Sequence, residues 1–215
     1  QDGDPFEITG DGLRPATSGL SDKASPSVKI RRGAIIRVVK SPQGSWRISQ
    51  LPEVESAFVA MDPRNGALRA LVGGFDFQKN KFNHVTQAWR QPGSSFKPFI
   101  YSAALEKGVT PATVVNDAPL FFSATDTGGK PWEPKNYDGN FEGPMSLRRA
   151  LAKSKNMVSI RVLQSIGAGY AQQWITRFGF DADKHPAYLT MALRAGSVTP
   201  LQMAGAYAVF ANGGY

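Results

Sequence analysis

The chain changes its pattern at Ser94, and this change constrains its fold more than any other feature. Before this point, short β-branched or alternating runs are separated by turns. After it, apolar residues recur at helical spacing, first in the segment 95–107, which Gly108 ends. Pro98 falls in the first turn of that segment, where a missing N–H costs little. The sequence therefore predicts strands in its first part and helices in the rest.

The part before Ser94 divides into three segments. Residues 1–27 are rich in Gly, Pro, Ser, Thr and Asp, which predicts a loop or a partly ordered linker. Residues 28–52 predict two short strands on either side of a Ser-Pro-Gln-Gly turn. A clearer hairpin follows, in which Val54–Met61 and Ala67–Val72 flank a turn ending in Asn-Gly, a pair that tolerates positive φ.

The helical part contains an irregular, aromatic segment at 109–142 and then four short helices. The last helix has Thr199 as its N-cap and Pro200 at its first position, and Gly213 follows its end. We expect these helices at about 146–153, 157–166, 170–178 and 200–211.

The first helix begins at a serine and a lysine three positions apart, in Gly93-Ser94-Ser95-Phe96-Lys97. Residues at i and i+3 share a helix face, so Ser94 would lie beside Lys97. A serine hydroxyl is a weak nucleophile until a base takes its proton, and a buried lysine with a lowered pKa can be that base. The free N–H groups of the first turn would favour developing negative charge. The alternative is an N-cap serine followed by an exposed lysine.

A second polar motif, Ser154-Lys155-Asn156, lies between two predicted helices, 60 positions after Ser94. A loop there could present a hydroxyl and a carboxamide to the cleft that contains Ser94. Ser154 could then relay a proton to a leaving amine, and Asn156 could hydrogen-bond a substrate amide. The alternative is a polar junction between helices, since Ser and Asn are ordinary capping residues.

Composition excludes several classes of site. The 215 residues contain no cysteine, and the two histidines, His84 and His185, lie far apart, so we predict no metal site and no cofactor. No stretch of 18 apolar residues occurs, which predicts no membrane span. The net charge of +8 suits either an anionic partner or a solubilising surface. From Gly143 onward, two acidic residues oppose eight basic ones: Arg148, Arg149, Lys153, Lys155, Arg161, Arg177, Lys184 and Arg194.

The two motifs together resemble the penicillin-recognising serine enzymes, which combine S-x-x-K, S-x-N and K-T-G. Three longer segments, at 90–99, 132–137 and 198–204, resemble the class A, bifunctional penicillin-binding proteins of the Gram-negative 1A type. The resemblance covers about residues 54–215. The strands at 28–52 resemble the end of the small OB-like domain inserted in that type.

This resemblance implies an α/β fold of the α+β type, in which helices flank a central antiparallel sheet. Residues 53–215 would form the N-terminal part of a transpeptidase domain, and residues 1–52 a linker and the tail of the OB-like module. The chain contains no Lys-Thr-Gly. The family places that motif on a later strand, which also supplies an oxyanion-hole N–H, so we expect this chain to hold an incomplete active site.

The resemblance also implies a role for each motif residue. Ser94 would be the acylated nucleophile, Lys97 its base and Ser154 a proton relay, and Asn156 would bind the substrate. The implied reaction is D,D-transpeptidation, which cross-links peptidoglycan through an acyl-enzyme formed with the D-Ala-D-Ala stem peptide.

The implied partners are peptidoglycan stem peptides on lipid II-derived glycan strands and β-lactam antibiotics, which would acylate the same serine, and not nucleic acid. The implied location is the periplasmic face of the bacterial inner membrane. An N-terminal anchor and a glycosyltransferase domain would lie outside this chain.

Other functions stay open at this point. A serine β-lactamase or a D,D-carboxypeptidase of the same superfamily shares the motifs. A class A β-lactamase needs a glutamate after S-x-N to activate water, and no glutamate follows Glu142. A basic module that binds nucleic acid or lipid is a third interpretation, but no Lys/Arg run with interleaved aromatic residues supports it.

Overall fold

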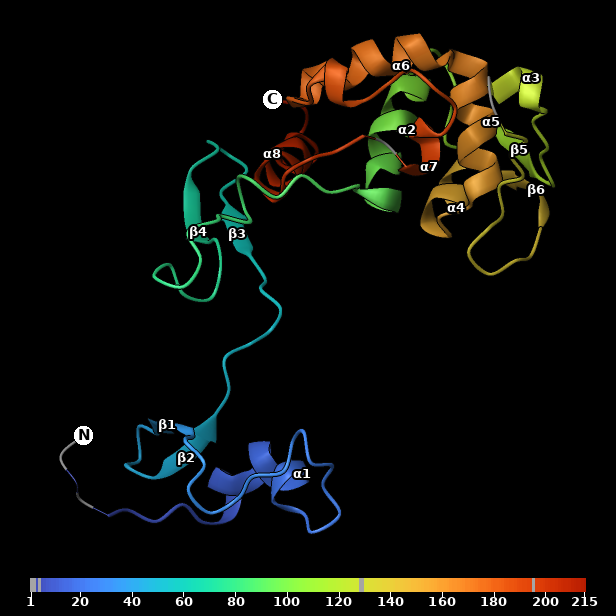
Figure 1. Cartoon of the computed structure of the whole chain (residues 1–215). Helices are drawn as coiled ribbons and strands as arrows, with labels where there is room; N and C mark the ends of the chain where they lie inside the picture. The colour runs from blue at the N-terminus through green and yellow to red at the C-terminus, as the bar shows by residue number, and fades with distance from the viewer. Residues whose placement is uncertain (1–2, 4, 128–129, 195) are drawn as a thin grey trace. The chain divides into compact units, whose positions relative to one another are not determined.

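The structure is a computed structural model that describes residues 3, 5–127, 130–194 and 196–215 (Figure 1). The chain forms two compact units, Gln1–Glu55 and Ser56–Tyr215, and each is described by itself. Among the described residues, no helix is both long enough and apolar enough to cross a membrane.

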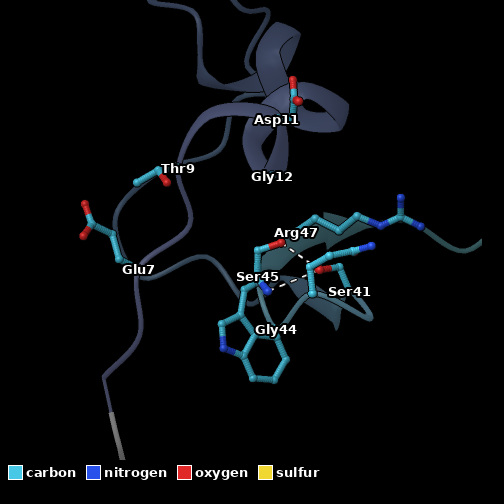
Figure 2. Close-up of a pocket in the computed structure, with 10 residues that line it drawn as sticks. Glu7, Thr9, Asp11, Gly12, Ser41, Gly44, Ser45 and Arg47 are labelled. Carbon is cyan, nitrogen blue, oxygen red and sulfur yellow. Dashed lines mark hydrogen bonds between the residues drawn. The ribbon is translucent and has the colours of Figure 1, made fainter.

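The first unit is built on a small antiparallel hairpin. Its strands are β1 (Arg37–Lys40) and β2 (Trp46–Ser49), which pair from Arg37 opposite Ser49 to Lys40 opposite Trp46. These strands confirm the pair expected within 28–52. A polar pocket of about 490 Å³ borders the hairpin (Figure 2).

The expectation of a loop or linker over 1–27 is wrong for part of that segment. Residues Gly10–Ala16 form the 3-10 helix η1, and Thr17–Leu20 form the short helix α1. Packing against β2 explains why this segment is helical. The backbone at Gly12 lies so close to β2 that a Cβ there would collide with the carbonyl of Trp46, and Ala16 is buried. Local composition does not reveal this contact, which joins segments more than 30 positions apart.

The second unit opens with the predicted hairpin in a shorter form. Its strands are β3 (Phe58–Met61) and β4 (Leu68–Val72), which pair in antiparallel register with an irregularity at Met61. Asp62 stabilises the turn, since its carboxylate accepts hydrogen bonds from the side chains of Arg64 and Arg69 at 2.7–3.0 Å. The later helix α8 packs against β3.

Helix α2 lies among three other helices of the second unit. Phe99, Ile100, Ala103 and Ala104 of α2 are fully buried, and α2 contacts α5, α6 and α7 (Figure 1). The helices are η2 (Gly93–Phe96), α2 (Lys97–Glu106), α3 (Ala124–Thr127), α4 (Leu147–Ala152), α5 (Asn156–Ile166), α6 (Ala168–Ile175), η3 (Thr176–Phe178), η4 (Ala182–Lys184), α7 (Met191–Arg194) and α8 (Pro200–Ala211).

Helix α8 confirms its predicted boundaries. Thr199 Oγ1 accepts a hydrogen bond from the N–H of Gln202, and the Gln202 side chain accepts one from the N–H of Thr199. These reciprocal bonds form a capping box, which satisfies N–H groups at the helix start.

A strand lies inside the segment 109–142, where the sequence predicts irregular structure. Strand β5 (Val114–Asp117) pairs in antiparallel register with β6 (Gly143–Ser146). The prediction for 109–142 is therefore wrong at β5. Strand β6 contains Gly and Pro, which are rare in strands, so only the pairing with β5 makes it one.

Candidate active site

The first motif lies at the turn that leads into α2. Ser94 and Ser95 belong to η2 and are exposed, whereas Phe96 and Lys97 are each only 1% exposed. The alternative of an N-cap serine followed by an exposed lysine is therefore wrong. Phe96 anchors the turn, since its ring stacks on His185 with the ring centroids 4.9 Å apart.

The neighbouring helix α8 also holds this turn. Tyr207 Oη donates a hydrogen bond of 2.8 Å to the backbone oxygen of Ser95. Ser95 Oγ donates one of 2.6 Å to the oxygen of Pro92. Ser95 is therefore occupied within the turn, whereas Ser94 Oγ makes no hydrogen bond within the described part of the chain.

Lys97 connects the first motif to the second. Its Nζ lies 2.7 Å from the backbone oxygen of Ser154, 2.9 Å from Ser154 Oγ and 2.7 Å from Asn156 Oδ1. The structure thus brings together three of the predicted site residues across nearly 60 positions. In the residues it describes, no hydrogen bond joins Lys97 to Ser94, so the amine faces the second motif.

These contacts suit both protonation states of Lys97. Burial lowers the pKa of Lys97 from 10.5 to about 8. The ammonium donates to all three acceptors. The neutral amine donates to the Ser154 and Asn156 carbonyl oxygens and accepts the hydroxyl proton of Ser154. The Ser154 hydroxyl can therefore reverse its direction as the proton leaves Lys97, without loss of a hydrogen bond.

The second motif lies at a tight junction between helices. Lys153 ends α4, and α5 begins at Asn156. Ser154 between them has a φ of 54°, and within the described residues it is the only non-glycine residue with positive φ. A non-glycine residue in this region carries strain that the surrounding structure has to offset.

Asn136 caps α5 in place of the motif residues. Asn136 Oδ1 accepts hydrogen bonds from the N–H of Asn156 at 2.8 Å and of Met157 at 3.4 Å. The Asn156 side chain instead contacts Lys97 and donates a hydrogen bond of 2.8 Å to the backbone oxygen of Lys135. Neither Ser154 nor Asn156 uses its side chain as a cap of α5, so capping does not explain these two residues.

A pocket of about 390 Å³ opens at this junction. Ser94 lines it together with both predicted residues of the second motif, so the nucleophile candidate faces the groups that contact Lys97. The lining residues are Ser94, Asn136, Tyr137, Asp138, Lys153, Ser154, Lys155 and Asn156. An exposed hydroxyl and a carboxamide at one pocket, with an amine of lowered pKa hydrogen-bonded directly behind its wall, can support covalent acyl transfer to serine.

Comparison with known proteins agrees with this geometry. Residues 56–215 match the family model described as the penicillin-binding protein transpeptidase domain. The chain belongs to this family. Residues 1–54 match the model of the penicillin-binding protein OB-like domain, so the predicted family and fold class are both confirmed.

Curated relatives include penicillin-binding protein 1A from two bacteria. The protein of Neisseria meningitidis serogroup B is 58% identical over 93% of this chain and 25% of its own length. The protein of Pseudomonas aeruginosa is 47% identical over 100% of this chain and 27% of its own length. The chain thus spans about a quarter of the length of the curated relatives it matches.

Solved structures give the same family. Penicillin-binding protein 1A from Haemophilus influenzae aligns with a TM-score of 0.75 at 45% identity, over 81% of this chain and 26% of that one. The PonA1 protein from Mycobacterium tuberculosis in complex with penicillin V aligns with a TM-score of 0.62 at 27% identity, over 74% of this chain and 45% of that one.

The excess positive charge of the transpeptidase region is largely engaged. Arg149, Lys153 and Lys155 form ion pairs with Glu142 or Asp138. These two carboxylates precede Gly143, so they were not included in the balance of charges from Gly143 onward. Three more cations contact backbone oxygens or aromatic rings: Arg161, Arg177 and Lys184. These contacts give a partner within the same unit to six of the eight basic residues counted from Gly143 onward.

The ion pairs around Lys155, the middle residue of the second motif, were not predicted from the sequence. Lys155 is 3% exposed and lies within 3.4 Å of carboxylate oxygens of Asp117, Asp138 and Glu142. Burial lowers its pKa, but the hydrogen bonds with Glu142 and Asp138 outweigh burial and raise the pKa to about 12. Lys155 stands at the middle position of S-x-N, which the motif pattern leaves free, so the pattern gave no signal for it.

Proposed function

We propose that this chain carries the nucleophile and proton-transfer groups of a D,D-transpeptidase that cross-links peptidoglycan. One observation carries the proposal: Lys97 Nζ contacts both Ser154 and Asn156 at the pocket that Ser94 lines. An exposed serine that shares a pocket with a serine and an asparagine, both hydrogen-bonded to a buried lysine, matches what serine acyl transfer requires.

The proposed first step forms an ester on Ser94. Neutral Lys97 turns its lone pair from the Ser154 hydroxyl to that of Ser94 and takes the Ser94 proton, while Ser94 Oγ attacks the carbonyl carbon of the penultimate D-alanine. The peptide bond breaks as Ser154 donates its hydroxyl proton to the D-alanine nitrogen, and the Lys97 ammonium passes the proton taken from Ser94 to Ser154. Asn156 Nδ2, which in the absence of substrate donates to the oxygen of Lys135, lies where it can reach a substrate amide.

The second step transfers the acyl group. An amine of a neighbouring stem peptide attacks the ester carbonyl, loses its proton through the same relay and releases Ser94. A β-lactam would follow only the first step, because its opened ring stays attached and blocks the acceptor amine. The similar PonA1 protein has been solved in complex with penicillin V, which supports β-lactams as ligands of this family.

The rest of the proposed enzyme extends beyond these residues. Lys-Thr-Gly does not occur in the 215 residues, so the carboxylate contact and one oxyanion donor would come from elsewhere. By analogy with penicillin-binding protein 1A, the whole protein would also contain a glycosyltransferase domain. It would lie on the periplasmic face of the inner membrane, held by an N-terminal anchor.

Hydrolysis by a class A β-lactamase route has less support. That route needs a glutamate that acts as a base toward water. Glu142 is the last glutamate of the chain, and hydrogen bonds with Lys153, Lys155 and Arg149 lower its pKa to about 2. Such a weak base does not activate water. A D,D-carboxypeptidase would share the first step and differ only in using water as the acceptor.

Covalent labelling of the full-length protein tests the proposal. After incubation with penicillin, peptide mapping by mass spectrometry should place the adduct on Ser94, and Ser94→Ala should remove it. Ser95→Ala is the matched control, because Ser95 is the adjacent exposed serine, and it should still be labelled. An adduct on Ser95 or Ser154 with Ser94 free would contradict the assignment.

The acceptor is tested separately. Incubation with a D-Ala-D-Ala stem peptide and a second, amine-bearing stem peptide should yield a cross-linked product together with free D-alanine. Release of D-alanine without cross-linked product would indicate a D,D-carboxypeptidase.

A further inference from the structure

The second motif is held from behind by a carboxylate that contacts neither Ser94 nor Lys97. We propose that Glu142 is a positioning residue, which binds the lysines on both sides of Ser154 and so keeps Ser154 and Asn156 in the geometry that contacts Lys97. This inference rests on the proposed function.

Glu142 spans the strained residue of the motif. Its Oε2 lies 2.7 Å from Lys153 Nζ, and its Oε1 lies 3.0 Å from Lys155 Nζ. These lysines directly precede and follow Ser154, the residue with a φ of 54°. A strained backbone persists only where its surroundings hold it, and one carboxylate here holds both neighbours.

Glu142 is itself fixed to the core. Its N–H donates a hydrogen bond of 3.0 Å to Asp117 Oδ2, and Asp117, at the end of β5, is 0% exposed. Asp117 Oδ1 accepts a hydrogen bond of 2.8 Å from Asn136 Nδ2, and Asn136 caps α5. The cap of α5 and the ion pairs around Ser154 therefore share one buried anchor.

The chemistry of Glu142 favours holding over proton transfer. Its hydrogen bonds with three cations keep it ionised at physiological pH, so it only accepts hydrogen bonds. Two of these cations flank Ser154, whereas the third, Arg149, lies on α4. Arg149 binds the same Oε2 atom as Lys153 but is not adjacent to Ser154. Its substitution therefore removes a cation from Glu142 without removing a residue that flanks the motif serine.

The loss of this carboxylate should release the motif. Lys155 is nearly fully buried, and a buried ammonium that loses a partner has to move or to recruit water. Movement at Lys155 displaces the adjacent Ser154 and Asn156, which supply all three acceptors of Lys97. A misplacement of about 1 Å at reacting groups typically costs on the order of 10²-fold in rate.

The experiment measures the acylation rate of the full-length protein by a fluorescent penicillin. Glu142→Gln keeps the size of the side chain and removes one charged oxygen. We expect acylation of Ser94 about 10-fold to 100-fold slower, with the final fraction of labelled protein unchanged. Partial unfolding would lower the labelled fraction instead of the rate constant. Arg149→Ala should react at the unsubstituted rate.

A second variant reaches the same motif from the core. Asp117→Asn opposes an amide N–H either to Asn136 Nδ2 or to Lys155 and the N–H of Glu142, and it should also slow acylation of the protein that stays folded. An unchanged rate in Glu142→Gln, or an equal loss in Arg149→Ala, would overturn the inference. If penicillin did not label Ser94 in the unsubstituted protein, the proposed function would fail and this inference with it.

Discussion

Lys97 Nζ lies 2.7 Å from Asn156 Oδ1, and these two residues are the first residues of α2 and α5. One hydrogen bond thus joins the starts of two helices that are distant in sequence. Burial at this point disfavours the ammonium and lowers the pKa of Lys97. The arrangement supplies a lysine that can lose its proton near neutral pH.

Removal of the amine should stop acylation and leave the fold intact. Lys97→Ala is expected to slow labelling by penicillin by about 10²–10⁴-fold, the usual contribution of a positioned base. Lys107→Ala is the control, since Lys107 is an exposed lysine at the other end of α2. Acylation of folded Lys97→Ala at the unsubstituted rate would remove Lys97 from the mechanism.

The pH dependence of acylation should follow Lys97. A base acts in its neutral form, and burial lowers the pKa of Lys97 to about 8. The second-order rate constant should therefore increase as pH rises toward 8 and level off above it. Stopped-flow labelling from about pH 6 to about pH 9 measures this profile. A profile that is flat or falls over this range would exclude a lysine base of that pKa.

Truncation of Asn156 should weaken acylation less than loss of the nucleophile. Asn156→Ala removes one acceptor of Lys97 and one donor toward substrate, for a cost of about 1–3 kcal/mol in the acylation barrier. Lys97 keeps both contacts with Ser154. Asn140→Ala is a nearby control, because Asn140 is exposed and contacts Asn136 and Lys155 through its backbone oxygen. A neutral Asn156→Ala would mean that its side chain does not serve the reaction.

At position 154 the serine hydroxyl is needed for the proton relay, whereas the backbone conformation favours glycine. Ser154→Gly and Ser154→Ala both lose the hydroxyl and should both lose the proton relay. Glycine tolerates the φ of 54° and alanine does not, so Ser154→Gly should be the more stable by about 1 kcal/mol. This difference corresponds to an unfolding temperature about 2–4 °C higher for a domain of this size, measurable by calorimetry. Equal unfolding temperatures would show that the left-handed backbone is not strained.

Predictions from the sequence succeeded where local signals decide the structure. Thr199 and Pro200 mark the start of α8 by chemistry that acts within a few residues, and the helix begins where they indicate. The predictions failed where pairing is distant. Strand β6 has the composition of a turn and becomes a strand only because β5 lies beside it, 26 residues earlier in the chain.

The sequence by itself determined which residues are candidates for the chemistry, because Ser94 and Lys97, and likewise Ser154 and Asn156, have reactive or hydrogen-bonding groups at spacings that a helix or a turn brings together. Only the tertiary structure decided how they are held. The burial of Lys97, the cap that Asn136 places on α5 and the bond from Glu142 to both neighbours of Ser154 all join residues distant in the chain. Burial and ion pairing depend on what packs nearby in space, and no local pattern of residues contains that information.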